Sequence, residues 1–67
     1  MLIRAEELKD GNIICYDNEK SWQVKSINMV STSYIRVKLH PFINGVVNKL
    51  HIVEHDYGRA SKLNISN

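Results

Sequence analysis

The sequence has few of the residues that stabilise very small proteins covalently or through metals. It contains one cysteine, Cys15, in 67 residues, so an internal disulfide is excluded. No CxxC pair and no Cys/His spacing typical of a zinc site is present. The Cys15 thiol lies in the apolar run 13–16, where a thiol is normally unreactive. We therefore predict neither a metal nor a cofactor.

Catalytic motifs are also missing. The three glycines each stand alone beside a turn, so there is no Gly-rich phosphate loop and no GK[ST] sequence. No pair of carboxylates is placed for general acid and base chemistry, and the hydroxyl residues at 31–33 have no base near them in sequence. We predict that the chain is not an enzyme.

Long hydrophobic runs are absent as well. Residues 1–7 carry acids where a signal peptide would have its apolar core, and no apolar run approaches the roughly 18 residues of a membrane span. A free cysteine in a chain without these signals is typical of a reducing compartment, so we expect a cytoplasmic protein.

The charge is only mildly unbalanced. The formal net charge is +2 and the pI is near 8.9, which permits a phosphate-bearing partner without requiring one. Hydrophobic residues make up 43% of the chain, enough for a core and against disorder. At this length a chain buries only about 60% of its unfolded surface, so we expect a single domain over residues 1–67 with a thin stability margin.

Short apolar segments between turn signals predict an all-β fold. We expect residues 2–9 to be extended and then to form a short turn, with a tight turn at Asp10-Gly11 and a polar turn at 17–20. The strand-sized runs are residues 12–16, 21–27, 34–40 and 46–53, with a closing strand near Leu63 and Ile65. At this length a small SH3-like barrel of about five strands fits better than a sandwich.

Residues 34–40 show the clearest alternation, with Ile35, Val37 and Leu39 inward. Asn44-Gly45 predicts a hairpin. A two-residue and a four-residue loop both pair Leu39 with Leu50 and Val37 with Ile52, whereas a three-residue loop would move the apolar residues to opposite faces. We favour the four-residue loop from Ile43 to Val46, because it keeps Pro41 out of a hydrogen-bonded site.

This register predicts an outward basic strip of Arg36, Lys38, His40, Lys49 and His51. The strip could hold a nucleic-acid backbone or an acidic protein face, or it could be an ordinary solvated strand face. Trp22 is in phase with Val24, which predicts a core position.

Aromatic residues at strand ends and in loops supply the other candidate contacts. Phe42 and Ile43 at the hairpin tip could form an interaction hot spot or a lid on the barrel, and residues 57–59 could form an exposed contact loop. The predicted partner-binding residues are Tyr34, Arg36, Lys38, His40, Phe42, Ile43, Lys49, His51, Tyr57 and Arg59.

Four short motifs carry a family resemblance. They are Ala-Glu-Glu-Leu-Lys-Asp-Gly at 5–11, Trp-Gln-Val at 22–24, Arg-Val-Lys-Leu at 36–39 and Asn-Gly at 44–45. Together they resemble the N-terminal KOW-like, SH3-type domain of elongation factor P and its relatives, over about residues 3–53. The resemblance implies a barrel that binds RNA or the ribosome. The family's Pro-Gly-Lys-Gly loop has no counterpart, because residues 27–33 contain neither lysine nor glycine, and the family's two later domains are absent from this sequence.

We therefore expect a non-catalytic binding module, an adaptor or regulator that binds and modulates a larger protein, of the kind that phages and mobile elements encode. The alternative is an RNA- or ribosome-binding KOW-like module that uses the basic face of the 34–53 hairpin. A homo-oligomer is the third possibility. No membrane partner is expected.

Overall fold

The computed structural model describes residues 1–16 and 20–66, so residues 17–19 of the turn predicted at 17–20 lie outside the described part. Its elements are β1 (Leu2–Arg4), the 3-10 helix η1 (Ala5–Glu7), β2 (Ile13–Cys15), β3 (Ser21–Met29), β4 (Tyr34–Ile43), β5 (Val46–Val47), β6 (Val53–Gly58) and β7 (Lys62–Asn64). Across these described residues no helix has the length and apolar character that a bilayer span requires. The all-β prediction is confirmed.

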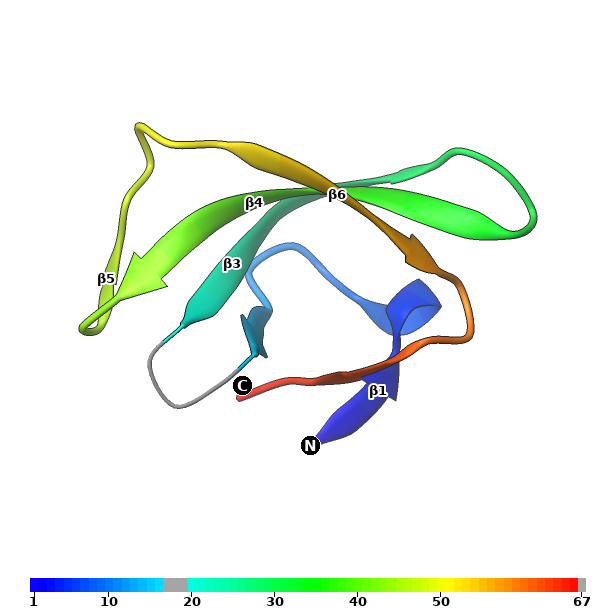
Figure 1. Ribbon diagram of the computed structural model, residues 1–67, viewed down its shortest axis with the longest axis horizontal. Coiled ribbons are helices and arrows are strands. Elements are labelled where there is room, and N and C mark those ends of the chain that lie inside the picture. The colour runs from blue at the N-terminus through cyan, green and yellow to red at the C-terminus, as the bar shows by residue number, and fades with distance from the viewer. Residues whose placement is uncertain (17–19, 67) are drawn as a thin grey trace.

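Two antiparallel sheets make up the fold. One has the order β2-β3-β4-β5, with β6 also paired to β4, and the other consists of β1 and β7. An isolated bridge between Ile14 and Ile65 links them. Figure 1 shows β4 and β6 above and the two chain ends close together below. Among the described residues β6 pairs with β4 alone, so the barrel is not closed.

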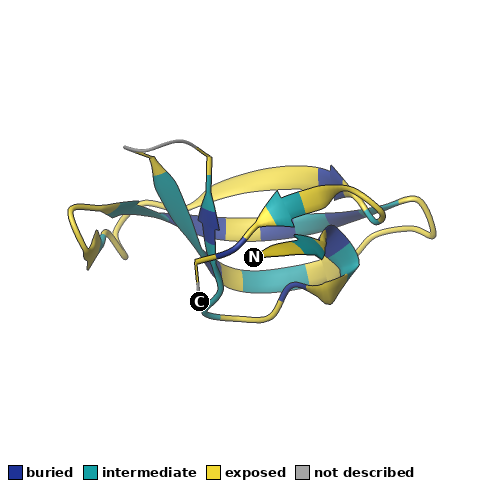
Figure 2. Cartoon of the chain, turned by 90° about the horizontal axis from the view of Figure 1, so that it is seen from below, coloured by how far each residue is buried: buried dark blue, intermediate teal, exposed yellow. Residues whose placement is uncertain are grey.

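The core lies between these two layers. Ile35, Val37 and Leu39 on β4 are 0%, 0% and 2% exposed, which confirms their predicted inward positions. They pack with residues from the other elements: Ala5, Leu8, Ile14, Val24, Tyr57 and Ile65. Figure 2 shows buried positions on strands of the larger sheet, while β1 and β7 themselves carry none. Because burying one aliphatic side chain contributes about 1.5–3 kcal/mol, this cluster is the main stabilising feature of the fold.

The two ends of the chain fold as the sequence predicts. Residues 2–9 form β1 followed by one 3-10 turn. Gly11 has a φ of +90°, and the Asn12 N–H donates to the Lys9 carbonyl at 3.1 Å, which closes the Asp10-Gly11 turn. The closing strand β7 pairs with β1, and Leu63 and Ile65 both pack on the core. The N-terminal segment is thereby held by the C-terminal one.

The β4–β5 hairpin has a shorter loop than predicted. Ile43 pairs with Val46, so the loop consists of Asn44 and Gly45 alone, with φ values of +52° and +78°. These two positive φ angles are those of a type I′ turn, whose twist matches that of the flanking strands. The prediction of a four-residue loop is therefore wrong. Asn-Gly selects the two-residue turn, and β4 extends to Ile43 through Pro41.

The predicted pairing fails beyond Val47. Leu39 pairs with Val53 and Val37 pairs with His55, instead of with Leu50 and Ile52. The register shifts by three residues between β5 and β6 because the chain leaves the sheet in a turn. An odd shift exchanges the faces of a strand, so the residues that the sequence placed inward are released to the surface.

Candidate partner-binding surface

The turn at 48–51 is fastened to the end of β4. The Asn48 N–H donates to the Pro41 carbonyl at 2.9 Å. Within the turn the His51 N–H donates to the Asn48 carbonyl at 3.3 Å, and the Leu50 N–H donates to Asn48 Oδ1 at 3.2 Å. The turn therefore has a defined backbone conformation.

His40 provides a further attachment for this turn. Its Nδ1 lies 2.8 Å from the His51 carbonyl, and because a carbonyl only accepts, Nδ1 carries the proton. His40 is 7% exposed, so its predicted outward position is wrong. The physical reason is the inserted turn, whose backbone satisfies the imidazole and covers it. His51 stays exposed, as predicted, while its carbonyl holds His40.

Leu50 occupies the outer position of this turn and is 97% exposed. Exposed leucines are common in folded proteins, so the turn that carries this one is the informative feature. Here the backbone hydrogen bonds hold the residue away from the core. Because almost none of its surface is covered by the described residues, its apolar side chain contributes little to folding.

Other exposed apolar side chains lie close to Leu50 in the sequence. Among the described residues ten large hydrophobic side chains are exposed, and five of them lie between positions 43 and 53. These five are Ile43, Val46, Leu50, Ile52 and Val53, and we call them the apolar tip. Exposed apolar residues that follow one another along a segment are candidates for an interaction surface. The predicted contact residue Ile43 belongs to the apolar tip, and Phe42 is half-buried next to it, opposite Val47.

The charge around the apolar tip has one sign. Between positions 40 and 53 the sequence contains no aspartate or glutamate, and it contains one lysine, Lys49. Lys49 and His51 are both exposed, on either side of Leu50. The tip is thus an apolar surface with a basic margin.

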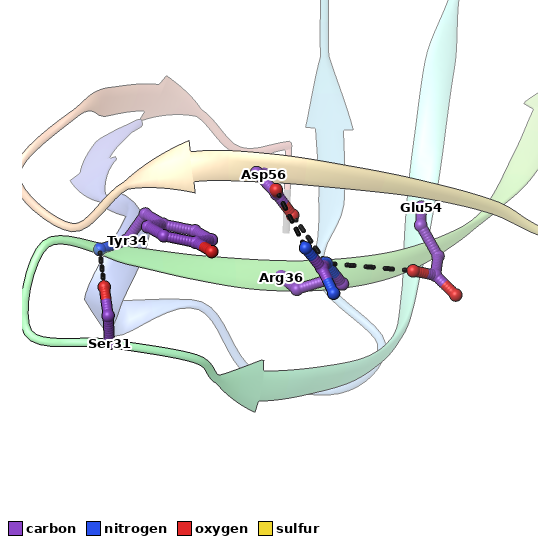
Figure 3. A network of polar contacts seen from close by, with 5 residues as sticks. All are labelled: Ser31, Tyr34, Arg36, Glu54 and Asp56. Atoms are coloured by element: carbon purple, nitrogen blue, oxygen red, sulfur yellow. Dashed lines mark hydrogen bonds and ion pairs between the residues drawn. The ribbon is translucent and has the colours of Figure 1, made fainter.

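The outer face of β4 and β6 is a network of ion pairs. Arg36 Nε and Nη2 donate to the two carboxylate oxygens of Asp56 at 2.9 and 3.2 Å, and Glu54 lies 3.8 Å from Nε (Figure 3). The hydrogen bond from Arg36 lowers the pKa of Asp56, and the same contact raises the pKa of Arg36. Lys38 is paired across the strands with Glu54. The carboxylates of Asp56 and Glu54 therefore lie opposite Arg36 and Lys38, so this part of the predicted basic strip is not uniformly basic.

The prediction that residues 57–59 form an exposed contact loop is wrong for Tyr57. β6 continues to Gly58, and Tyr57 points into the core opposite Ile35, where it is 7% exposed. Its ring lies 4.4 Å from the His55 ring, centroid to centroid. Arg59 is half-buried beside the Glu6 carboxylate, at 3.7 Å. The three-residue shift in register placed Tyr57 on the inward face.

Tyr34 begins β4 at the opposite end from the tip. Its N–H donates to Ser31 Oγ at 3.2 Å (Figure 3), and its side chain is half-buried. Tyr34 and Arg59 therefore lie away from the apolar tip. From the predicted set, Phe42, Ile43, Lys49 and His51 lie on the β4–β5 hairpin and the turn that follows it.

Sequence reasoning missed Val46, Leu50, Ile52 and Val53 as surface residues. The signal for them is a break in alternation: Val46-Val47 and Ile52-Val53 are adjacent apolar pairs, which one continuous half-buried strand would not contain. Asn48 stands between these pairs, and asparagine is a turn-forming residue.

A hollow of about 200 Å³ opens on the concave side of the sheet, between β6 and the ends of β2 and β3. Its lining residues are Tyr16, Trp22, Leu39, Val53, Glu54 and His55. Trp22 packs against the core at its margin and is half-buried, so its predicted core position is only partly reached. The hollow lies where a closed barrel would have another strand.

Comparison of the chain with protein-family models, with curated proteins and with solved structures finds no match, so the resemblance to the elongation factor P domain stays a prediction.

Proposed function

We propose that this chain is a non-catalytic binding module, an adaptor or regulator that attaches to a larger protein through the apolar tip. The observation that carries the proposal is Leu50, which is 97% exposed on a turn that hydrogen bonds hold in place. A leucine on a mobile loop could reduce its exposure to water by a change in loop conformation. A leucine on an ordered turn is already presented for contact.

The energetics favour this use of the tip. Burying one leucine or isoleucine against a partner contributes about 1.5–3 kcal/mol. Ordering a loop on binding opposes that gain, and here the turn is ordered before the partner arrives. A few such anchors are enough for specific recognition, because a handful of residues usually carries most of the binding free energy.

Binding to RNA is the weaker candidate for the same hairpin. The guanidinium of Arg36 already donates to Asp56, and Glu54 lies opposite Lys38. A phosphate contact at this face would have to replace those carboxylates. Association driven by phosphates would also weaken steeply with salt, by a slope of about 0.7 per phosphate for a single strand.

Affinity capture with one changed side chain tests the proposal. The tagged chain, its Leu50→Asp variant and a Met29→Asp variant are incubated with lysate of the source cells, with and without nuclease. Met29 is 54% exposed on β3, outside the apolar tip, and so provides a matched apolar-to-acid change. We expect the same protein to be retained by the parent chain and by Met29→Asp, and lost with Leu50→Asp.

Two outcomes would contradict the proposal. Retention of the partner by Leu50→Asp would place the contact elsewhere. Loss of the captured material after nuclease treatment, together with its loss on Lys49→Glu, would support the nucleic-acid alternative. A Leu50→Asp chain that unfolds at the same temperature as the parent shows that the effect is one of binding.

A further inference from the structure

In the part of the chain that the structure describes, β6 forms a sheet edge, with β4 on one side and no strand on the other. Its six residues pair with Tyr34–Leu39 of β4, and no other strand pairs with it in the described parts of the chain. Because successive residues of a strand direct their N–H and C=O groups to opposite edges, half of the β6 backbone groups point away from β4. Residues 53–56 are all exposed. These groups are therefore available to an extended chain.

β6 lacks three of the common devices that protect a sheet edge, and its charged residues are acidic. Edge strands are commonly protected by lysine, proline or a bulge. Val53–Gly58 contains no lysine and no proline, and its pairing with β4 is continuous over six residue pairs. By contrast, β3 carries a bulge between Val24 and Ser26, with the exposed Lys25 at that point. β6 thus keeps the regular geometry that strand addition requires.

The hollow beside β6 supplies an apolar surface for an added strand. Tyr16 and Trp22 lie on one side of it, Val53 on the other, and the buried Leu39 at its base. An extended chain along the β6 edge would direct every second side chain over this hollow. The aromatic rings would then lose water contact, so apolar side chains are preferred at those positions.

The charges on β6 determine which kind of extended segment can pair with its free edge. Glu54 and Asp56 lie on the outer face, each opposite a cation of β4. A second copy of β6 pairing about a two-fold axis would place these carboxylates opposite Glu54 and Asp56 of the other chain, and like charges across a strand pair are destabilising. Lysine or arginine opposite them would complete a row of alternating charges. The edge therefore disfavours self-pairing and favours a basic strand.

We propose that β6 accepts an extended segment of another protein as an additional strand, with lysine or arginine facing Glu54 and Asp56 and apolar side chains over the hollow. This surface does not include Leu50, although Val53 belongs both to the apolar tip and to β6. Main-chain hydrogen bonds would supply affinity and the alternating side chains specificity.

A tethered strand tests the proposal without an identified partner. The probe is the sequence Thr-Lys-Val-Lys-Val-Lys-Thr, joined to Asn67 through about 12 glycine and serine residues, which span roughly 20 Å. The Ser66 N–H donates to the Ile13 carbonyl, so the tail starts beside β2, near the hollow. Tethering gives an effective concentration on the order of millimolar. The readout is the exchange rate of each backbone amide.

We expect the lysine tail to slow exchange of the outward amides of β6 by at least about tenfold, the protection that a bond closed nine-tenths of the time provides. Two matched tails serve as controls: one with glutamate in place of each lysine, and one with proline in place of each valine. Neither should protect β6, because the first repels Glu54 and Asp56 and the second has two prolines, which remove two N–H groups and interrupt strand pairing.

Substitutions in the chain separate this proposal from the proposed function. The lysine tail should protect β6 equally in the Leu50→Asp chain, and Glu54→Lys should shift the preference toward the glutamate tail. Unchanged β6 exchange with the lysine tail, equal protection by the glutamate tail, or protection at another edge would each overturn strand addition. None of these outcomes bears on the contact proposed for Leu50.

Discussion

The two halves of β4 share one alternation of apolar and polar residues, but they differ in how far the apolar side chains are buried. On its inward face Ile35, Val37 and Leu39 are 0–2% exposed, whereas Ile43, two further positions along that face, is 57% exposed. In Figure 1 the first half of β4 lies above the chain ends, and the second half extends past them as a hairpin. Alternation tells which face of a strand is apolar. It does not tell whether that face is covered by the same chain.

The largest expected difference between the two halves is in stability. Ile35→Ala leaves a cavity in the core and should lower the free energy of unfolding by about 2–5 kcal/mol, whereas Ile43→Ala should change it by less than about 0.5 kcal/mol. Chemical denaturation of both variants measures the two values. Similar losses for both would mean that the tip is part of the core.

The contact between His40 and the turn gives the next largest effect. His40→Leu leaves the His51 carbonyl without its donor and should cost about 1–3 kcal/mol, with faster amide exchange at residues 48–51. His40→Asn keeps an N–H donor near the Nδ1 position and should retain much of the protection. If the two variants exchanged alike, the hydrogen bond would not be what fixes the turn.

The type I′ loop predicts a smaller, purely local cost. Gly45 has a φ of +78°, and nothing lies within 4 Å of the position of an added Cβ. Gly45→Ala should therefore lose about 1–2 kcal/mol from backbone conformation alone. Asn44→Gly, the matched change at the preceding positive φ, should be close to neutral. Thermal unfolding compares them, and equal losses would argue against a two-residue turn.

The smallest effect concerns the ion pairs on the outer face of β4 and β6. Because folding lowers the pKa of Asp56, the pair with Arg36 contributes stability above about pH 4, the ordinary range of the carboxyl group, and loses it as the pH falls further. Asp56→Asn should lower the melting temperature slightly at pH 6 and not at pH 2. A difference in melting temperature between the parent and Asp56→Asn that increased as the pH fell would contradict a stabilising role of the ionised Asp56 carboxylate.

Much of the fold follows from local sequence signals. The alternation at 34–40, the Asp10-Gly11 turn and the apolar phase of Leu63 and Ile65 each predict the observed structure, because local geometry and burial agree at these places. Asn44-Gly45 also predicts the hairpin. These signals do not depend on distant parts of the chain.

The candidate surface was harder to predict because it depends on one register shift. A turn of three extra residues after Val47 exposes Leu50, turns Tyr57 inward and lets the backbone cover His40. Sequence shows the apolar residues but not the shift, since a continuous strand would also accommodate most of them. Adjacent apolar pairs around Asn48 are the only local sign of it.

The central claim is that the apolar tip serves binding and not folding. Its most direct test is Leu50→Asp, measured for both properties on the same sample: the free energy of unfolding by denaturation, and the affinity for the captured partner. We predict an unfolding free energy within about 0.5 kcal/mol of the parent and an affinity at least about 30-fold weaker, the equivalent of 2 kcal/mol. An unchanged affinity, or a loss of stability that accounts for the loss of binding, would contradict the claim.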